Sequence, residues 1–138
     1  MSDLVIFDTS ILVDELRRGL HLDRIESLTG LVRISSVVLA ELWRGATKPA
    51  ERKFLLALER NHPVLAPTRR NWLDSGQLLA QVRADRGFAP EKLRSLHFDV
   101  LIALTARSNG ARLVTSDRVD FELIASYRAA KGLILEVW

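Results

Sequence analysis

The sequence contains no cysteine, which excludes structural disulfides, zinc-thiolate sites and thiol nucleophiles. Its three histidines, His21, His62 and His97, are scattered without the spacing of a zinc site. No apolar run is long enough to cross a bilayer. Neither common phosphate-loop pattern, G-x-x-x-x-G-K-[ST] or G-x-G-x-x-G, is present, so a nucleotide-binding loop is unsupported.

The length of 138 residues and the mean hydropathy of +0.08 are typical of one globular domain with an apolar core. We therefore predict a single domain over residues 1–138. The start Met1-Ser2-Asp3-Leu4 leads into an apolar run without a basic leader, so the sequence predicts no signal peptide. The expected location is the cytoplasm.

The chain is basic, with a net charge of +3 and a sequence pI of about 9.8. If Asp8, Glu41, Asp99, Asp117 and Asp120 share one metal-filled cleft, the other residues carry a net charge of +8. Such a surface suits a polyanionic partner. Sixteen of the twenty basic residues are arginine, and the forked guanidinium group favours contacts with phosphate.

Short apolar runs alternate with helical patterns, which predicts an α/β fold with a mostly parallel sheet. Strands are predicted at 4–7, 31–34, 64–65, 112–115 and 133–137. Helices are predicted at 10–17, 22–28, 36–46, 50–60, from Thr68 to Gly87, and from Pro90 or Ser95 to Asn109. The helix after Thr68 is expected to carry one apolar stripe, formed by Trp72, Gly76, Leu79 and Val82.

Two acids follow predicted strands. Asp8 comes directly after the run at 4–7, and Asp117 follows the run at 112–115 after one intervening residue. Open parallel sheets place their sites at the carboxyl ends of the strands, so neighbouring strands would bring these two carboxylates together. Each acid could instead cap the helix or turn that follows it.

Two more acids lie in apolar helical segments. Asp99 is one helical turn from Leu96 and Ile102, and an isolated ionised carboxylate on such a face costs several kcal/mol unless it is paired or metal-bound. Glu41 lies in a similar apolar run. The alternatives are an arginine partner for Asp99 and an i,i+3 pair with Arg44 for Glu41.

Carboxylates that converge on one point repel each other, and they stay ionised together only when a cation lies among them. Ligation by oxygen alone favours a hard ion such as Mg²⁺ or Mn²⁺ over zinc. Such ions can activate water against a phosphodiester without a nucleophilic side chain. A phospho-acceptor receiver domain matches the length and the alternation, but it needs an acid after the third strand, where Ala66-Pro67 stands.

The order and contexts of these acids resemble the PIN domain, in particular the toxin ribonucleases of VapBC-type toxin-antitoxin modules. The matching segments are F-D-T-S at 7–10, V-V-L-A-E-L at 37–42, D-V-L-I-A-L-T-A at 99–106 and T-S-D-R-V-D-F at 115–121. The third segment is the most specific, and the resemblance covers essentially the whole chain. A long, charged stretch at 87–97 and the pair His97-Phe98 depart from the family pattern.

The resemblance implies a three-layer α/β/α fold around a mostly parallel sheet of four or five strands. It also implies roles for individual residues. The metal-holding acids would be Asp8, Glu41, Asp99 and Asp117, with Asp120 as an auxiliary catalytic acid. The side chains that orient water or phosphate would be Thr9, Ser10, Thr115 and Ser116.

The resemblance further implies an endoribonuclease that uses Mg²⁺ or Mn²⁺, forms a homodimer and binds a cognate antitoxin protein. It implies no association with a membrane. Two rival hypotheses stay open at this point. One is a PIN nuclease of RNA processing that is not a toxin. The other is a PIN-like module that binds RNA or a protein without cutting.

Overall fold

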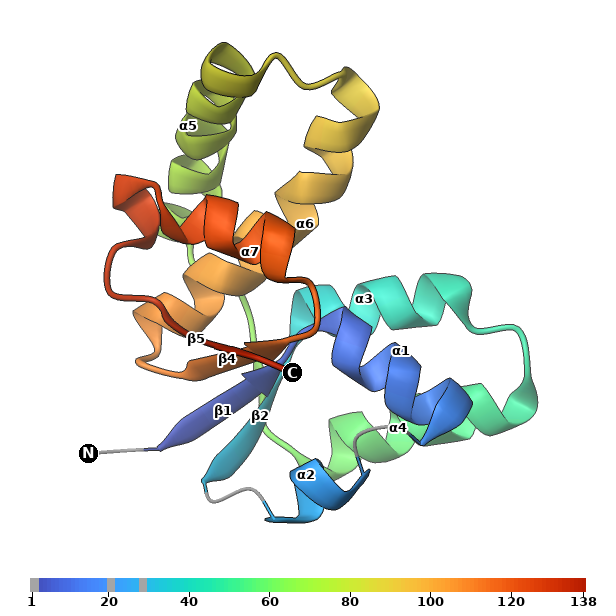
Figure 1. Cartoon of the computed structure of the whole chain (residues 1–138). Helices are drawn as coiled ribbons and strands as arrows, with labels where there is room; N and C mark the ends of the chain where they lie inside the picture. Colours follow the sequence, from blue (N-terminus) through green and yellow to red (C-terminus); the bar gives the residue numbers. More distant parts are fainter. Residues whose placement is uncertain (1–2, 20–21, 28–29) are drawn as a thin grey trace.

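A five-stranded, fully parallel sheet forms the centre of the computed structural model, which describes residues 3–19, 22–27 and 30–138. The strands are β1 (Leu4–Phe7), β2 (Leu31–Ser35), β3 (Val64–Leu65), β4 (Arg112–Thr115) and β5 (Ile134–Val137). Their order across the sheet is β3-β2-β1-β4-β5 (Figure 1). The predicted strands are therefore confirmed, although β2 ends one residue later and β5 begins one residue later than predicted.

Helices cover both faces of the sheet. In the described residues they are α1 (Thr9–Arg18), α2 (Leu22–Ser27), α3 (Ser36–Gly45), α4 (Pro49–Asn61), α5 (Arg69–Arg86), α6 (Pro90–Ser108), α7 (Arg118–Ala125) and the 3₁₀ turn η1 (Arg128–Ala130). Helices α5, α6 and α7 gather on one side of the molecule, while α1, α2 and α4 lie on the other (Figure 1). The three-layer α/β/α prediction is confirmed.

The central strand β1 is apolar and buried, as expected for a parallel strand that is covered on both faces. Val5 and Ile6 have no exposed surface, and Phe7 is almost fully buried. On either side, β1 pairs with β2 and with β4, and Phe7 lies opposite Val114. This pairing sets the carboxyl ends of β1 and β4 side by side.

Side-chain caps determine where α3 and α5 begin. The Ser35 hydroxyl accepts hydrogen bonds from the backbone N–H groups of Val37 and Val38, which starts α3 directly after β2. Helix α5 starts at a capping box in which Thr68 and Asn71 satisfy each other's backbone N–H groups. The N-cap predicted at Thr68 is thus confirmed.

The predicted stripe of α5 is right at Val82 but wrong at Trp72 and Gly76, which are exposed, because the buried face is rotated by about one residue. Its buried residues are Asn71, Ser75, Leu78 and Val82. Trp72 is 53% exposed. Two polar side chains are buried because each has a partner: Asn71 closes the capping box and accepts from the Ser108 hydroxyl, while Ser75 bonds the Trp72 carbonyl. The pattern of apolar residues therefore placed most of the buried face one residue too far along the chain.

The rotation of α5 can be tested with two leucines of the same helix. We expect Leu78→Ala to lower the free energy of unfolding by about 2–5 kcal/mol, because Leu78 is 1% exposed and its removal leaves a cavity. We expect Leu73→Ala, at a position that is 50% exposed, to change it by less than about 0.5 kcal/mol. Urea unfolding of both variants measures the difference, and equal losses would contradict the observed rotation.

Candidate functional site

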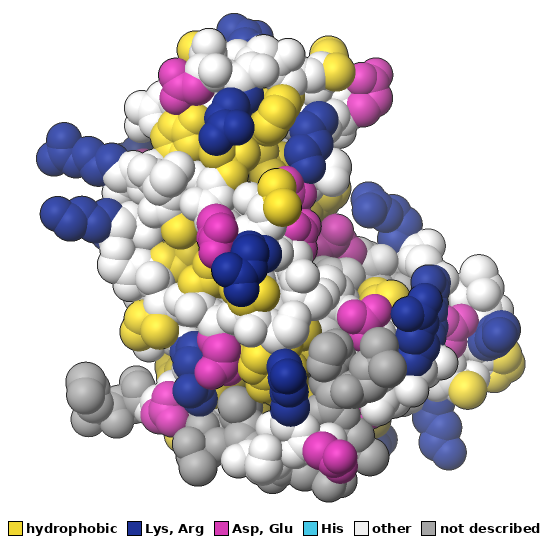
Figure 2. Space-filling model, in the orientation of Figure 1, with side chains coloured by type: hydrophobic (Ala, Val, Ile, Leu, Met, Phe, Trp, Pro, Cys, Tyr) yellow, Lys and Arg dark blue, Asp and Glu magenta, His cyan; other side chains and the backbone are white. Residues whose placement is uncertain are grey.

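The candidate site lies at the carboxyl edge of the sheet, where β1 and β4 end next to each other. Asp8 follows β1 and Asp117 follows β4, while Glu41 lies on α3, Asp99 on α6 and Asp120 on α7. Figure 2 shows acidic side chains gathered where the α5–α7 group meets α3, with lysine and arginine side chains around them.

Asp8 is 3% exposed, and only one of its two carboxylate oxygens has hydrogen-bond partners among the described residues. Its Oδ2 accepts hydrogen bonds from the hydroxyls of Ser10, at 2.7 Å, and Thr115, at 2.9 Å. It also accepts from the Ser10 backbone N–H at 3.4 Å, so the predicted alternative role as a cap of α1 holds as well. Its Oδ1 is buried without a hydrogen-bond partner among the described residues, which is rare for a buried polar atom and leaves a position for a ligand.

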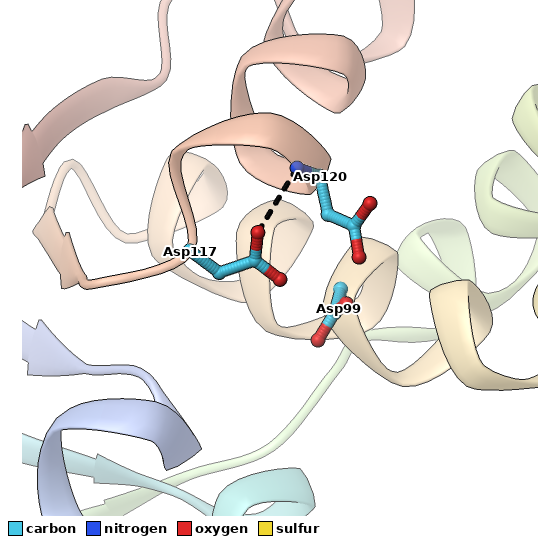
Figure 3. Close-up of side chains that lie close together, drawn as sticks. All are labelled: Asp99, Asp117 and Asp120. Atoms are coloured by element: carbon cyan, nitrogen blue, oxygen red, sulfur yellow. Dashed lines mark hydrogen bonds between the residues drawn. The ribbon is translucent and has the colours of Figure 1, made fainter. Parts of the chain in front are cut away.

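Asp99, Asp117 and Asp120 bring three carboxylates to one point (Figure 3). One oxygen atom of each lies within 4.8 Å of the others, a separation that a single cation can span. The Asp117 carboxylate also accepts from the backbone N–H of Asp120 at 3.1 Å and so caps α7. Asp117 therefore caps α7 and belongs to the cluster at the same time.

Glu41 is held by a hydroxyl rather than by an ion pair. The Thr9 hydroxyl donates to Glu41 Oε1 at 2.8 Å. The Arg44 guanidinium lies over the ring of Phe98, at 5.2 Å from its centroid, although its charge still lowers the pKa of Glu41. The alternative in which Arg44 merely pairs with Glu41 is thus not what the structure contains.

Burial and mutual repulsion raise the pKa of three of these acids. Burial raises the pKa of Asp8 and of Glu41, and the charge of Asp8 raises the latter further. The pKa of Asp99 rises to about 8, first through burial and then through the charges of Asp8, Glu41, Asp120 and Asp117. All four other acids are thus near enough to act on Asp99, although among the described residues only Asp99, Asp117 and Asp120 have carboxylate oxygens within 4.8 Å of one another.

Arginine does not neutralise the centre of this region. Within the described part of the chain, no lysine or arginine forms an ion pair with Asp99. A buried carboxylate without a cationic partner stays ionised only if a cation approaches it. The free oxygen of Asp8, the all-oxygen donor set and the raised pKa of Asp99 together fit a hard divalent ion.

Hydroxyl groups surround the acids. Those of Thr9, Ser10 and Thr115 bond directly to Glu41 or Asp8, and the Ser116 backbone N–H donates to the Ser10 hydroxyl at 3.2 Å. These contacts orient the carboxylates. The expected role of the four residues toward water or phosphate stays a prediction.

Sequence analysis missed a lysine at this site. Lys92 Nζ lies 2.8 Å from both carboxylate oxygens of Asp120. Lys92 belongs to the charged stretch at 87–97, which was noted only as a departure from a family pattern. That charge excess was the one signal in the sequence that could have pointed to it.

The fold and the acids define an α/β domain with a carboxylate cluster at the carboxyl edge of a parallel sheet. A model of the PIN domain matches residues 5–126, and the chain belongs to the PIN domain family. The matched range includes all five acids. A comparison with curated proteins gives no match. None of the described helices is long and apolar enough to cross a membrane.

Several solved structures have a similar fold. A chain of the DNA-bound VapBC structure from Salmonella typhimurium is 27% identical, with a TM-score of 0.69 and coverage of 100% of this chain and 99% of that one. A chain of VapBC2 from Rickettsia felis, bound to a promoter DNA fragment, is 24% identical, with a TM-score of 0.71 and 98% coverage of both chains. VapBC-1 from nontypeable Haemophilus influenzae gives 22% identity, a TM-score of 0.71 and 98% coverage of both.

The raised pKa of Asp99 predicts how the stability of the metal-free protein depends on pH. Because the pKa of about 8 in the folded state exceeds the ordinary value of 3.8, the stability from this group is complete below about pH 4 and is lost as the pH rises through 8. Asp99→Asn should therefore raise the free energy of unfolding at pH 8 by about 1 kcal/mol or more. Urea unfolding in a chelator measures this gain, which should shrink toward pH 5.

The matched control is Asp23→Asn, on the exposed surface of α2. The difference in free energy of unfolding between this variant and the wild-type protein should not change between pH 5 and pH 8. A gain in the Asp99 variant that is equally independent of pH would contradict the assignment of Asp99 to a repulsive cluster.

Proposed function

We propose that the chain, as one domain over residues 1–138, is a VapC-type toxin endoribonuclease that hydrolyses RNA with Mg²⁺ or Mn²⁺. The observation that carries this proposal is a group of carboxylates in which Asp99 has no ion-pair partner among the described residues and a pKa of about 8, beside a buried free oxygen on Asp8. PIN domains are nucleases, and the similarity to chains of VapBC structures over nearly the full length supports the toxin assignment.

In this proposal the acids differ in how they would hold the metal. Asp8 and Asp99 would be the principal ligands because they are the most confined, while Glu41 and Asp117 would complete the set directly or through water. When bound, a divalent ion supplies the charge that activates water and stabilises the phosphodiester as it is cut. The hydroxyls of Thr9 and its neighbours fix the carboxylates, so little reorganisation is needed when substrate arrives.

The proposal includes two protein contacts. One is a cognate antitoxin, in keeping with the VapBC complexes among the similar structures. A basic side chain of that partner would neutralise the carboxylates in place of the metal. The other is a second copy of the chain, because the resemblance to VapBC toxins implies a homodimer.

The activity can be tested with two isosteric substitutions. We expect purified protein to cleave single-stranded or loop RNA with Mn²⁺ or Mg²⁺, and Asp8→Asn or Asp99→Asn to abolish detectable cleavage. The physical reason is that each amide removes one negative ligand without changing the shape of the side chain. Gel analysis of the RNA products is the measurement.

Asp23→Asn serves as the active control, and Mn²⁺ should raise the melting temperature of the wild-type protein but not that of Asp99→Asn. Cleavage by the wild-type protein that persists in excess chelator would overturn the metal-dependent mechanism. RNA binding without cleavage under every metal condition would favour a non-cleaving PIN module.

The toxin assignment predicts an effect on cells. Expression of the wild-type chain should arrest growth, Asp8→Asn should not, and co-expression of a small protein encoded beside it should restore growth. The reason is that an unrestrained ribonuclease depletes RNA until its site is covered. Growth curves provide the measurement, and normal growth with an active wild-type enzyme would favour a PIN nuclease of RNA processing.

A further inference from the structure

Lys92 provides a fixed cation at the rim of the acidic cluster. Its ammonium contacts both carboxylate oxygens of Asp120 at 2.8 Å and lies 5.9 Å from the ring centroid of Phe88. Asp120 raises the pKa of Lys92, and the charges of Asp117 and Asp99 raise it further, so the amine stays charged. Lys92 and Asp99 are seven residues apart on α6, which puts them on one face of that helix.

The contact does not exhaust the hydrogen-bonding capacity of Lys92. An ammonium group has three N–H donors, and two suffice for the oxygens of Asp120. The Lys92 side chain is 39% exposed, whereas that of Asp120 is 13% exposed. One donor is therefore available to a group that approaches from solvent.

A cavity of about 480 Å³ opens beside this ion pair. Its charged lining residues are Arg86, Lys92, Asp120 and Glu122, and it lies between the end of α5, the start of α6 and α7. Asp120 belongs both to this wall and to the carboxylate cluster, so the cavity adjoins the candidate site directly. A chain lying in it would continue from the acids past Lys92 and Arg86 and past Glu122, which pairs with Arg118.

We propose that this cavity is a subsite for the RNA strand, in which Lys92 binds a backbone phosphate next to the cleaved bond and Asp120 positions Lys92. The inference rests on the proposed function, because it takes RNA as the substrate. It assigns Asp120 as a positioning residue, since both of its oxygens contact the Lys92 ammonium.

The geometry favours an RNA phosphate over a purely structural ion pair. The pair is part-exposed and Asp120 also belongs to the acidic cluster, so a ligand that reaches the acids can contact Lys92 as well. Five carboxylates repel a polyanion, so a nearby ammonium lowers the barrier to its approach. The lysine is close enough to offset that repulsion locally without neutralising Asp99.

The test measures RNA binding separately from cleavage. In an Asp99→Asn background, which prevents cutting, the affinity for a single-stranded RNA oligonucleotide is measured by fluorescence anisotropy across a range of KCl concentrations. Adding Lys92→Met should weaken binding at low salt and reduce the slope of log affinity against log salt by about 0.7, the value for one lost phosphate contact. Lys92→Gln is measured alongside it as a second neutral variant.

Three further variants identify the cause. Lys92→Arg should restore most of the affinity and the slope, because it keeps a cation within reach of Asp120. Asp120→Asn should keep the slope, since Lys92 keeps its charge, and adding Lys92→Met to it should weaken binding less than in the parent, because Lys92 is no longer positioned. Lys53→Met, which removes an exposed lysine of α4, should change neither.

An unchanged affinity and slope in both neutral variants, while the wild-type protein still cleaves RNA, would overturn this inference alone. A failure of the parent protein to bind RNA at all would overturn it together with the proposed function. A slope that falls equally in Lys53→Met would show a diffuse surface charge instead of a subsite and would also overturn it.

Discussion

The repulsion between carboxylates crowded at the edge of the sheet is the constraint on which the rest of this structure depends. Asp8 and Asp99 are taken out of water by the packing of β1 and α6, and each charge makes the next one harder to maintain. Protons or a cation must therefore compensate, and a raised pKa in the absence of metal is the signature of that need. The hydroxyls around Asp8 lessen the problem but leave one of its oxygens without a partner.

The topology explains why the repulsion arises at this edge. From β1 the chain proceeds to β2 and β3 on one side, whereas β4 and β5 occupy the other, so the strand order reverses between β1 and β4. Loops that leave the carboxyl ends at such a point diverge to opposite sides and open a crevice. Asp8 and Asp117 lie on those two loops, and α3 and α6 carry Glu41 and Asp99 toward the same crevice.

Much of this arrangement could be predicted from the sequence because it follows from local patterns. The strands at 4–7 and 112–115 were predicted at their observed bounds, and the acids that follow them identified the edge. The face of α5 could not be predicted, because Asn71 and Ser75 are buried through partners that no apolar pattern reveals. The pairing of Lys92 with Asp120 spans 28 residues and depends on how α6 and α7 pack, so local spacing carries no trace of it.

The acids of the site differ in whether a cation neutralises them. Asp120, at the rim, has its own lysine, whereas Asp99 has no ion-pair partner among the described residues. Had arginine neutralised every acid, the cluster would be a structural ion-pair network with no need for metal. Had no cation been present, a polyanion would meet only repulsion at the entrance. Under the proposed function, the inner acids would attract a divalent ion to the centre, and the ammonium held by the outer acid would attract a phosphate chain to the edge.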